Sequence, residues 1–408
     1  MAACTKRDAT NKRRRSKSPK RAATTPTVKQ AIRSKSPKGA ATTKRKERRS
    51  FSQELPCLAK IGARLSPFEA ALSLVAPIAM AFLPPAYRSW LLWNAGCQLA
   101  LFLPYAVIPA LLTGNMFYVD LAWPLGLAIL GLNGIVYGSG LWIRRALMGG
   151  CVFAHGARMF MGAAVLFYPY SKAEDLPRYR FAKLRYIAEG GSPWAWPWKM
   201  VHDILQQCCA NMTVFACPVV LACFDLEEVG APLSPWLSPS MGLSSFEWAG
   251  YATWLCAIAW ESVADGQKIL FEVRTRGTPD QHTAVLGHPP FATSSYSLWT
   301  LCRHPNYFGE WMAWNGLALA CLPSLSKRTC PQTKLGLLVT LFVLSRFMYD
   351  CLLYWTGAEP AEHFSARKRP LYRLYQERTR VFWPVELVPF ADHGRMRLWP
   401  GANNVPCG

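Results

Sequence analysis

The chain has 408 residues, of which 51% are hydrophobic and 13% aromatic, and its formal net charge is +22. Apolar stretches of about 20 residues, long enough to cross a bilayer, recur along it. A soluble all-α protein would carry fewer such long uncharged runs. No pair of CxxC motifs or Cys/His spacing is typical of a zinc site, so we expect no metal. The composition predicts an all-α, polytopic membrane helix bundle of about six to eight transmembrane helices.

The charge is concentrated in the first 50 residues. Nine Lys and nine Arg against Asp8 and Glu47 give this segment +16, which leaves 22 − 16 = +6 for the rest. The sequence RSKSPKRAATT (15–25) recurs as RSKSPKGAATT (33–43). With no core-forming residues, the segment cannot bury enough apolar area to offset the entropy of ordering. We therefore predict a disordered basic tail over 1–55, with no cleavable signal peptide.

Several roles for this tail remain open. Its KRRRSKSPKR run is typical of a nuclear-import or nucleic-acid patch, and it also suits contact with anionic lipids. Phosphorylation of Ser18 and Ser36 would weaken either contact. A solvated tail that only fixes topology and an organelle transit peptide are the other readings.

Eight apolar runs follow as predicted spans, at roughly 67–84, 88–113, 117–142, 147–168, 203–223, 246–264, 307–324 and 335–355. The loops at 169–202 and 266–303 are basic and should lie in the cytosol, whereas 224–245 is acidic and should lie outside. Arg144, Arg145, Lys327 and Arg328 oppose this scheme. The expected organisation is a tail (1–55), N-terminal transmembrane helices (56–114), a membrane domain (115–392) and a C-terminal tail (393–408).

Ionisable residues within the apolar runs are candidates for function, because they are costly in a membrane. Asp120 begins the run FYVDLAWPLG, and Arg158 lies inside FAHGARMFMG. Glu261, Asp265 and Lys268 share one face of a predicted helix. A salt-bridged helix end at the membrane surface is the alternative for these three.

The densest polar stretch is LCRHPNYFGEW, residues 301–311. Pro305 suits the first turn of a helix, which would place Asn306 and Glu310 on one face. Arg303 and His304 precede the positive end of that helix, which favours an anion. We predict a pocket for a phosphate-bearing ligand with an amide and a carboxylate one turn deeper. The alternative is that Glu310 lies near the helix N-terminus only because a negative charge there interacts favourably with the helix dipole.

A second polar stretch, KRPLYRLYQERTRVFWP, occupies residues 368–384. Tyr372, Tyr375 and Arg378 are spaced to face one way on a helix. A Tyr/Arg face suits a nucleotide, since Arg binds phosphate and Tyr stacks or bonds ribose. An amphipathic helix at the membrane surface is the alternative.

These stretches together resemble the steroid 5α-reductase superfamily, in particular its branch described as a domain of unknown function. The signature CRHPNYFGEWMAWNGLALA carries most of the resemblance. YVDLAWPLG (118–126), WESVADGQK (260–268) and the C-terminal stretch are similar to further segments of that branch, and HGARMFMG with EDLPRYRFAKLR (174–185) is a weaker match. The resemblance covers roughly 115–390.

That resemblance implies a helical membrane fold, NADPH as cofactor, and reduction of a carbon–carbon double bond conjugated to a carbonyl. Asn306 and Glu310 match positions that hold the nicotinamide, Asp265 matches a ribose or adenine position, and Tyr375 and Arg378 match C-terminal cofactor contacts. The expected cofactor-binding residues are Asp265, Lys268, Arg303, His304, Asn306, Glu310, Tyr372, Tyr375 and Arg378. The candidate catalytic residues are Glu310, Tyr307 and Asp120. The steroid reductases have a substrate-binding Tyr and Glu in their early helices, and this sequence has no residues that align with them. The resemblance therefore implies neither steroid specificity nor the identity of the proton donor.

Two other functions compete with a reductase. Isoprenylcysteine and phospholipid methyltransferases, which use S-adenosylmethionine, share an Arg-His-Pro-x-Tyr helix start, and Glu359 and Glu362 resemble their later glutamates. A basic tail on a sterol-reductase-like body also resembles the lamin B receptor, a nuclear-envelope tether. We expect a multi-pass protein of the endoplasmic reticulum or nuclear envelope. Its partners would be a lipid-like small molecule and membrane lipids, with anionic lipid or nucleic acid at the tail and no obligate protein partner.

Overall fold

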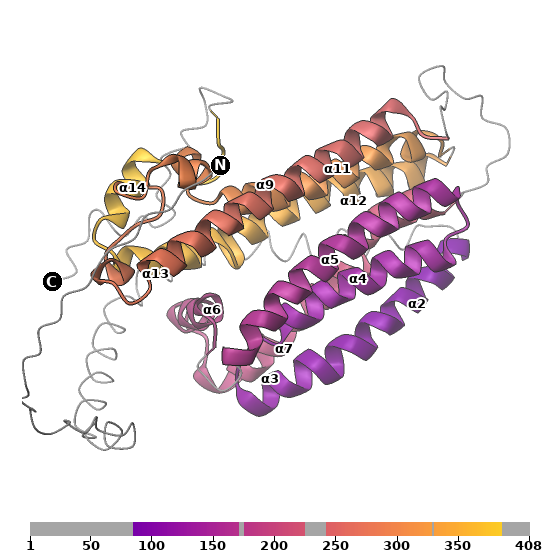
Figure 1. Ribbon diagram of the computed structural model, residues 1–408. Helices are drawn as coiled ribbons and strands as arrows, with labels where there is room; N and C mark the ends of the chain where they lie inside the picture. The colour runs from indigo at the N-terminus through magenta and orange to yellow at the C-terminus, as the bar shows by residue number, and fades with distance from the viewer. Residues whose placement is uncertain (1–84, 171–174, 225–241, 329, 386–408) are drawn as a thin grey trace, which may run out of the picture. The chain divides into compact units, whose positions relative to one another are not determined.

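The computed structural model describes residues 85–170, 175–224, 242–328 and 330–385 (Figure 1). Every regular element in these ranges is a helix or a helical turn, and the only β-type pairing among them is an isolated parallel bridge between Cys302 and Arg380. The predicted all-α class is confirmed for this part of the chain. The basic tail with Ser18 and Ser36, the predicted span at 67–84, most of the acidic loop and the tail at 393–408 lie outside the described residues.

The first half of the described chain forms a layer of helices that begins with α2 (Pro85–Phe102). A single π-helical turn, η1 (Leu103–Val107), joins α2 to α3 (Ile108–Thr113). The chain continues through α4 (Val119–Tyr137), α5 (Trp142–Tyr170), α6 (Pro177–Ala188), the short turn η2 (Pro193–Ala195), α7 (Trp196–Met212) and α8 (Ala216–Cys223). Every residue of α8 is buried, because this helix packs against α4, α5, α11 and α12.

The second half begins with the long helix α9 (Ser245–Thr275). Short turns η4 (Pro279–His282) and η5 (Ser294–Tyr296) and the one-turn helix α10 (Ser297–Leu301) then lead to α11 (Pro305–Ser326) and α12 (Pro331–Asp350). A second π-helical turn, η6 (Cys351–Trp355), connects α12 to α13 (Ala358–Lys368) and α14 (Tyr372–Arg378). Figure 1 shows α9 and α11 running side by side, with α13 and α14 beside the C-terminal end of α9.

Four helical stretches in the described residues are long and apolar enough to cross a membrane: Tyr87–Thr113, Val119–Tyr137, Pro193–Cys223 and Pro331–Lys368. The protein is thus a membrane protein by length and composition of its helices, and the predicted number of spans is confirmed only in part. The predicted spans at 147–168, 246–264 and 307–324 do coincide with helices, α5, α9 and α11. These three are not among the four apolar stretches, and they carry the polar side chains of the candidate site.

Glycines allow the closest helix pairs to form. A Cβ at Gly250 on α9 would lie 2.4 Å from the backbone nitrogen of Ala320 on α11, and one at Gly309 on α11 would lie 2.8 Å from the Cβ of Glu261. Small residues bring membrane helices close because apolar burial gives little driving force in lipid. The consequence is that the polar faces of α9 and α11 meet at short range.

Candidate functional site

The start of α11 is the centre of the candidate site. His304 is its N-cap and Pro305 its first residue, as the sequence predicts. The indole nitrogen of Trp260 on α9 donates a hydrogen bond of 2.9 Å to the Pro305 carbonyl. This bond and the close contact at Gly309 fix α11 against α9, so that Asn306 and Glu310 approach the polar face of α9.

A buried acid network lies between α5, α9 and α11, and we define it as His155, Arg158, Glu261, Asp265 and Glu310. His155 Nε2 lies 2.9 Å from Glu310 Oε1, and Arg158 makes a hydrogen bond to Glu261 Oε1. Arg158 Nη1 is 3.8 Å from Asp265 Oδ2, and its Nη2 is 3.8 Å from Glu310 Oε2. One guanidinium therefore faces three carboxyl groups.

Two further side chains hold this network in place. The indole nitrogen of Trp314, one turn after Glu310, donates to Glu310 Oε1 at 2.9 Å. The amide nitrogen of Asn306 donates to Asp265 Oδ1 at 3.1 Å. Asn306 also lines a pocket on the other side of the α11 N-terminus, and so connects the acid network to that pocket.

The pocket has a volume of about 130 Å³ and lies between the end of α9, the α10–α11 corner and the C-terminal helices. Three cations, Lys268, Arg303 and Arg369, line it, and Arg369 Nε is buried without a hydrogen-bond partner. Aromatic rings supply much of its wall. The other lining residues include Glu272, Trp299, His304, Asn306, Tyr307, Ser365, Tyr372 and Tyr375.

The aromatic wall depends on a tight turn before α10. Gly287 has φ +83°, and a Cβ there would lie 2.3 Å from the Trp299 carbonyl oxygen and 2.6 Å from the Tyr375 hydroxyl. The Tyr375 hydroxyl donates to the same carbonyl. Burial raises the pKa of Tyr375 and of Tyr372 well above the usual value for tyrosine, so both hydroxyls remain proton donors.

Arg303 has a structural role that the sequence did not indicate. Its side chain is fully buried and makes a two-pronged pair with Glu362 on α13, with Nε 2.7 Å from Oε1 and Nη2 3.2 Å from Oε2. Its Nη1 donates to the carbonyls of Gln376 and Thr379. These four hydrogen bonds engage four of the five N–H groups of the guanidinium, and Arg303 thereby joins the start of α11 to α13 and α14.

His304 belongs to the same arrangement. Its Nε2 lies 3.0 Å from Glu362 Oε1, and its ring stacks on Tyr307 with centroids 5.1 Å apart. Burial lowers the pKa of His304 below its usual value, although the hydrogen bond to Glu362 acts in the opposite direction. The neutral imidazole then donates its Nε2 proton to the Glu362 carboxylate. Glu362 Oε2 also accepts a hydrogen bond of 2.7 Å from Gln376 Nε2.

Asp120 lies apart from the pocket, at the first turn of α4. The Tyr179 hydroxyl donates to its carboxylate, and Arg178 Nη2 on α6 is 3.2 Å from Oδ2. The pKa of Arg178 is raised: loss of solvent opposes its charge, but Asp120, Tyr179 and Tyr307 outweigh that effect. Arg178 thus holds α6 against the start of α4 through its ion pair with Asp120.

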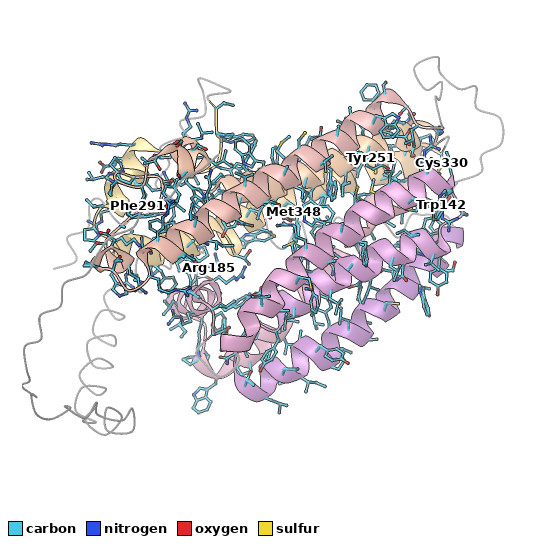
Figure 2. The ribbon with its side chains drawn as sticks, viewed as in Figure 1. Trp142, Arg185, Tyr251, Phe291, Cys330 and Met348 are labelled. Carbon is cyan, nitrogen blue, oxygen red and sulfur yellow. The ribbon has the colours of Figure 1, made fainter. Side chains whose placement is uncertain are left out.

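Helix α6 is held against the C-terminal helices by its other face. Phe181 packs on the ring of His363 on α13 with centroids 5.0 Å apart. Arg185 (labelled in Figure 2) donates 3.5 Å to the carbonyl of Tyr354 in η6. The described part of the segment EDLPRYRFAKLR thus packs against α13 and η6.

The structure therefore brings together most of the predicted cofactor-binding residues. Six line the pocket: Lys268, Arg303, His304, Asn306, Tyr372 and Tyr375. Asp265 and Glu310 lie in the acid network next to it. Arg378 differs, because it is exposed at the last position of α14 and does not line the pocket. Of the candidate catalytic residues, Tyr307 lines the pocket and Asp120 does not.

Sequence reasoning missed Ser365 and Arg369 as pocket residues and Glu362 as the partner of Arg303. Arg369 stands directly before Pro370 in the RKRP run, and the residue before a proline is driven to extended backbone. It is the C-cap of α13, with φ −125° and ψ 107°. A charged residue at such a break no longer follows the face of the helix. The Arg-Pro pair was therefore the feature of the sequence that could have indicated Arg369 as a pocket residue.

Comparison with known proteins identifies one family. The family described as "protein of unknown function (DUF1295)" matches residues 107–379, about two thirds of the chain. No curated protein and no solved structure matches the chain. The matched range contains the acid network and the lining residues of the pocket, and it ends one residue after α14.

Proposed function

The chain belongs to the DUF1295 family of proteins of unknown function, and we propose that it is a membrane-bound, NADPH-dependent reductase related to the steroid 5α-reductase superfamily. The substrate would be a lipid-like or sterol-like compound with a carbon–carbon double bond conjugated to a carbonyl. The observation that carries the proposal is that residues expected to bind the cofactor, from two distant stretches and from α9, line one pocket next to the acid network.

The residues of the pocket suit part of a dinucleotide. Lys268 and Arg369 would hold phosphate, because a guanidinium with a buried, unpartnered Nε requires an acceptor. Tyr372 and Tyr375 would contact the adenosine part. The volume of about 130 Å³ is below the roughly 300–1,000 Å³ of typical ligand sites. This pocket would therefore enclose one part of NADPH, and the rest would extend past Asn306.

The nicotinamide end would meet Asn306 and Glu310. Asn306 Oδ1 is buried and has no hydrogen-bond partner, so it offers an acceptor to a carboxamide. When bound, NADPH supplies a hydride, and the protein supplies orientation and charge. Tyr307 is the pocket hydroxyl that we assign to the substrate carbonyl, with Arg178 near enough to stabilise negative charge on it.

The methyltransferase alternative gains no support from the position of Glu362. Both oxygens of Glu362 accept hydrogen bonds from Arg303, His304 and Gln376. No acceptor remains on this carboxylate for a ligand amine. The nuclear-envelope tether depends on the basic tail, which lies outside the described residues.

Ligand-dependent thermal unfolding of the detergent-purified protein tests the proposal, with NADPH, NADH and S-adenosylmethionine in parallel. A ligand that binds the native state raises Tm by mass action. We expect NADPH to raise Tm and Glu310→Gln to abolish turnover of an enone substrate without loss of expression. A rise with S-adenosylmethionine alone would refute the reductase and favour a methyltransferase.

A further inference from the structure

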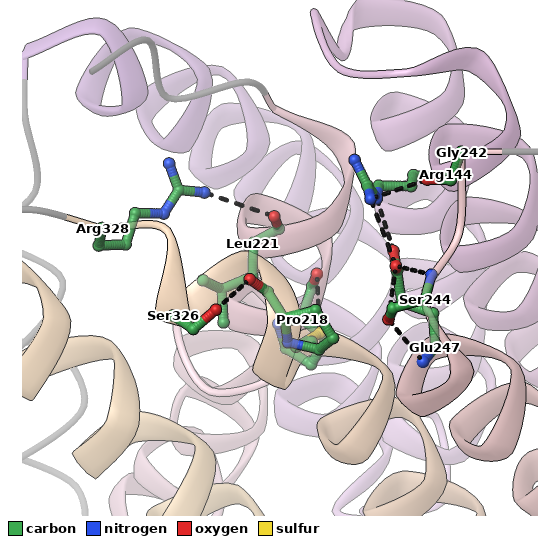
Figure 3. A network of polar contacts seen from close by, with 10 residues as sticks. Arg144, Pro218, Leu221, Gly242, Ser244, Glu247, Ser326 and Arg328 are labelled. Carbon is green, nitrogen blue, oxygen red and sulfur yellow. Dashed lines mark hydrogen bonds and ion pairs between the residues drawn. The ribbon is translucent and has the colours of Figure 1, made fainter. Parts of the chain in front are cut away.

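Helix α9 carries two deeply buried glutamates, Glu247 in its first turn and Glu261 near its middle. Glu247 accepts from Arg144 Nε at 2.5 Å and from Arg144 Nη2 at 3.3 Å (Figure 3). Its Oε2 also accepts from the Ser244 backbone nitrogen at 2.7 Å and from the Ser244 hydroxyl at 2.9 Å. Here one arginine meets one carboxylate, and both oxygens are bonded, so the ionised form is well stabilised.

Glu261 has a different environment. Its Oε1 contacts Arg158 Nη2, but its Oε2 is buried and has no hydrogen-bond partner. The residue is only 6% exposed. The guanidinium on which it depends is shared with Asp265 and Glu310, each at 3.8 Å. An ionised Glu261 would therefore be a buried charge with one partner, and that partner is divided among three acids.

The other two acids of the network have better means to remain ionised. Glu310 Oε1 lies 2.9 Å from both His155 Nε2 and Trp314 Nε1. Asp265 accepts from Asn306, its side chain is 40% exposed, and Lys268 lies one turn further along α9. Among the described residues, the ion pairs of this network join Glu261, Asp265 and Glu310 to Arg158, and Glu310 also to His155. Glu261 alone lacks both a second donor and contact with solvent.

From this geometry we propose that Glu261 is a neutral carboxylic acid at physiological pH and stores an exchangeable proton beside Arg158. Burial and repulsion from neighbouring carboxylates both favour the protonated form of an acid, and of the three acids that share Arg158 they act most strongly on Glu261, which has one donor and little exposure. Asp265, whose side chain is 40% exposed and which shares Arg158 with Glu261, gives the proton a path by which to exchange.

A proton store at this position would serve the proposed reductase, and this part of the inference rests on that function. Reduction of the conjugated double bond adds a hydride at the β-carbon while the π electrons move to the carbonyl oxygen. A proton then completes the C–H bond at the α-carbon. The group that donates this proton must be protonated again, and Glu261 would supply the proton for that step. Glu261 would then be a carboxylate paired with Arg158 until solvent returns a proton.

Infrared spectroscopy of the purified protein in lipid nanodiscs tests the proton store without cofactor or substrate. A protonated carboxyl group has a C=O stretch that is distinct from that of a carboxylate and shifts in heavy water. We expect this band in the wild type at neutral pH, its retention in Glu247→Gln, and its loss in Glu261→Gln. Absence of the band in the wild type, or its persistence in Glu261→Gln, would overturn the proposal.

A second measurement on the wild type does not depend on the folding of any variant. Carbodiimides react with carboxyl groups in their protonated form, so an apolar carbodiimide followed by peptide mass spectrometry should label Glu261 and leave Glu247 unlabelled. Equal labelling of both residues, or none at Glu261, would contradict the proposal. Both readouts omit NADPH, so their failure would leave the reductase proposal standing, and failure of NADPH binding would leave the proton store standing.

Discussion

The pair between Arg303 and Glu362 makes the sharpest prediction for stability. Glu362→Gln keeps the size and shape of the side chain but replaces one oxygen by an amide that donates. Of the four donors that face Glu362, two belong to Arg303 and one each to His304 and Gln376. At least one oxygen would lose both of its bonds, and the fully buried guanidinium would lose its counter-charge.

The loss of stability in Glu362→Gln can be estimated from the interactions that the substitution removes. Breaking a buried ion pair by removal of one partner costs about 3–5 kcal/mol. We take the lower end, about 3 kcal/mol, because glutamine retains one acceptor and Arg303 keeps two backbone carbonyls. With roughly 2 °C of Tm per kcal/mol in a large chain, Tm should fall by roughly 6 °C.

Thermal unfolding followed by intrinsic tryptophan fluorescence measures this change. Limited proteolysis adds a local readout, because loss of the pair should free α13 and α14 and expose the chain after residue 357 to cleavage. Glu377→Gln, at an exposed position on α14, is the matched control and should lower Tm much less, because an exposed ion pair contributes at most about 1 kcal/mol. A Glu362→Gln protein with the Tm and the cleavage pattern of the wild type would show that the pair does not anchor the C-terminal helices.

Three further changes test the site, its packing and its pH dependence. Arg369→Gln should weaken NADPH binding about tenfold to a hundredfold in a titration, by loss of a charge-assisted bond of about 1.5–3 kcal/mol, whereas exposed Arg373→Gln should not. Gly309→Ala should lower Tm because its Cβ would lie 2.8 Å from α9, whereas Gly96→Ala meets no atom within 4 Å and should leave Tm equal or higher. The lowered pKa of His304 means that the unfolded chain binds more protons below pH 6.5. Tm should therefore fall as pH drops from 7 toward 5, and less steeply in His304→Gln; an equal slope in both proteins would contradict this assignment.

Local features of the site could be predicted from the sequence because they depend on near neighbours. Pro305 fixes the start of α11, and the helical repeat then places Asn306 and Glu310 on one face. The same reasoning put Tyr372 and Tyr375 together on α14. It could not extend that face to Arg378, since α14 ends at this residue and leaves its side chain exposed.

Partners that are distant in the chain could not be predicted in this way. The sequence predicts that Arg303 binds phosphate. In the structure its guanidinium pairs with Glu362, which lies 59 residues later in the chain. His155 meets Glu310 across 155 residues, and no local pattern encodes that contact. The predicted number of spans is confirmed only in part, because the helices that carry the acid network, α5, α9 and α11, are not among the four apolar stretches.

The contact between Arg303 and the segment from Glu362 to Arg380 has a consequence for biosynthesis. The Arg303 backbone nitrogen bonds to the Arg380 carbonyl at 2.7 Å, and α13 and α14 supply one wall of the pocket. A ribosome delivers these residues after all the helices from α2 to α12. The membrane helices can insert and pack while the pocket still lacks a wall and Arg303 still lacks Glu362. The pocket thus becomes complete only after this segment is made, and a nascent chain that ends at residue 357 would hold helices α2 to α12 without this wall.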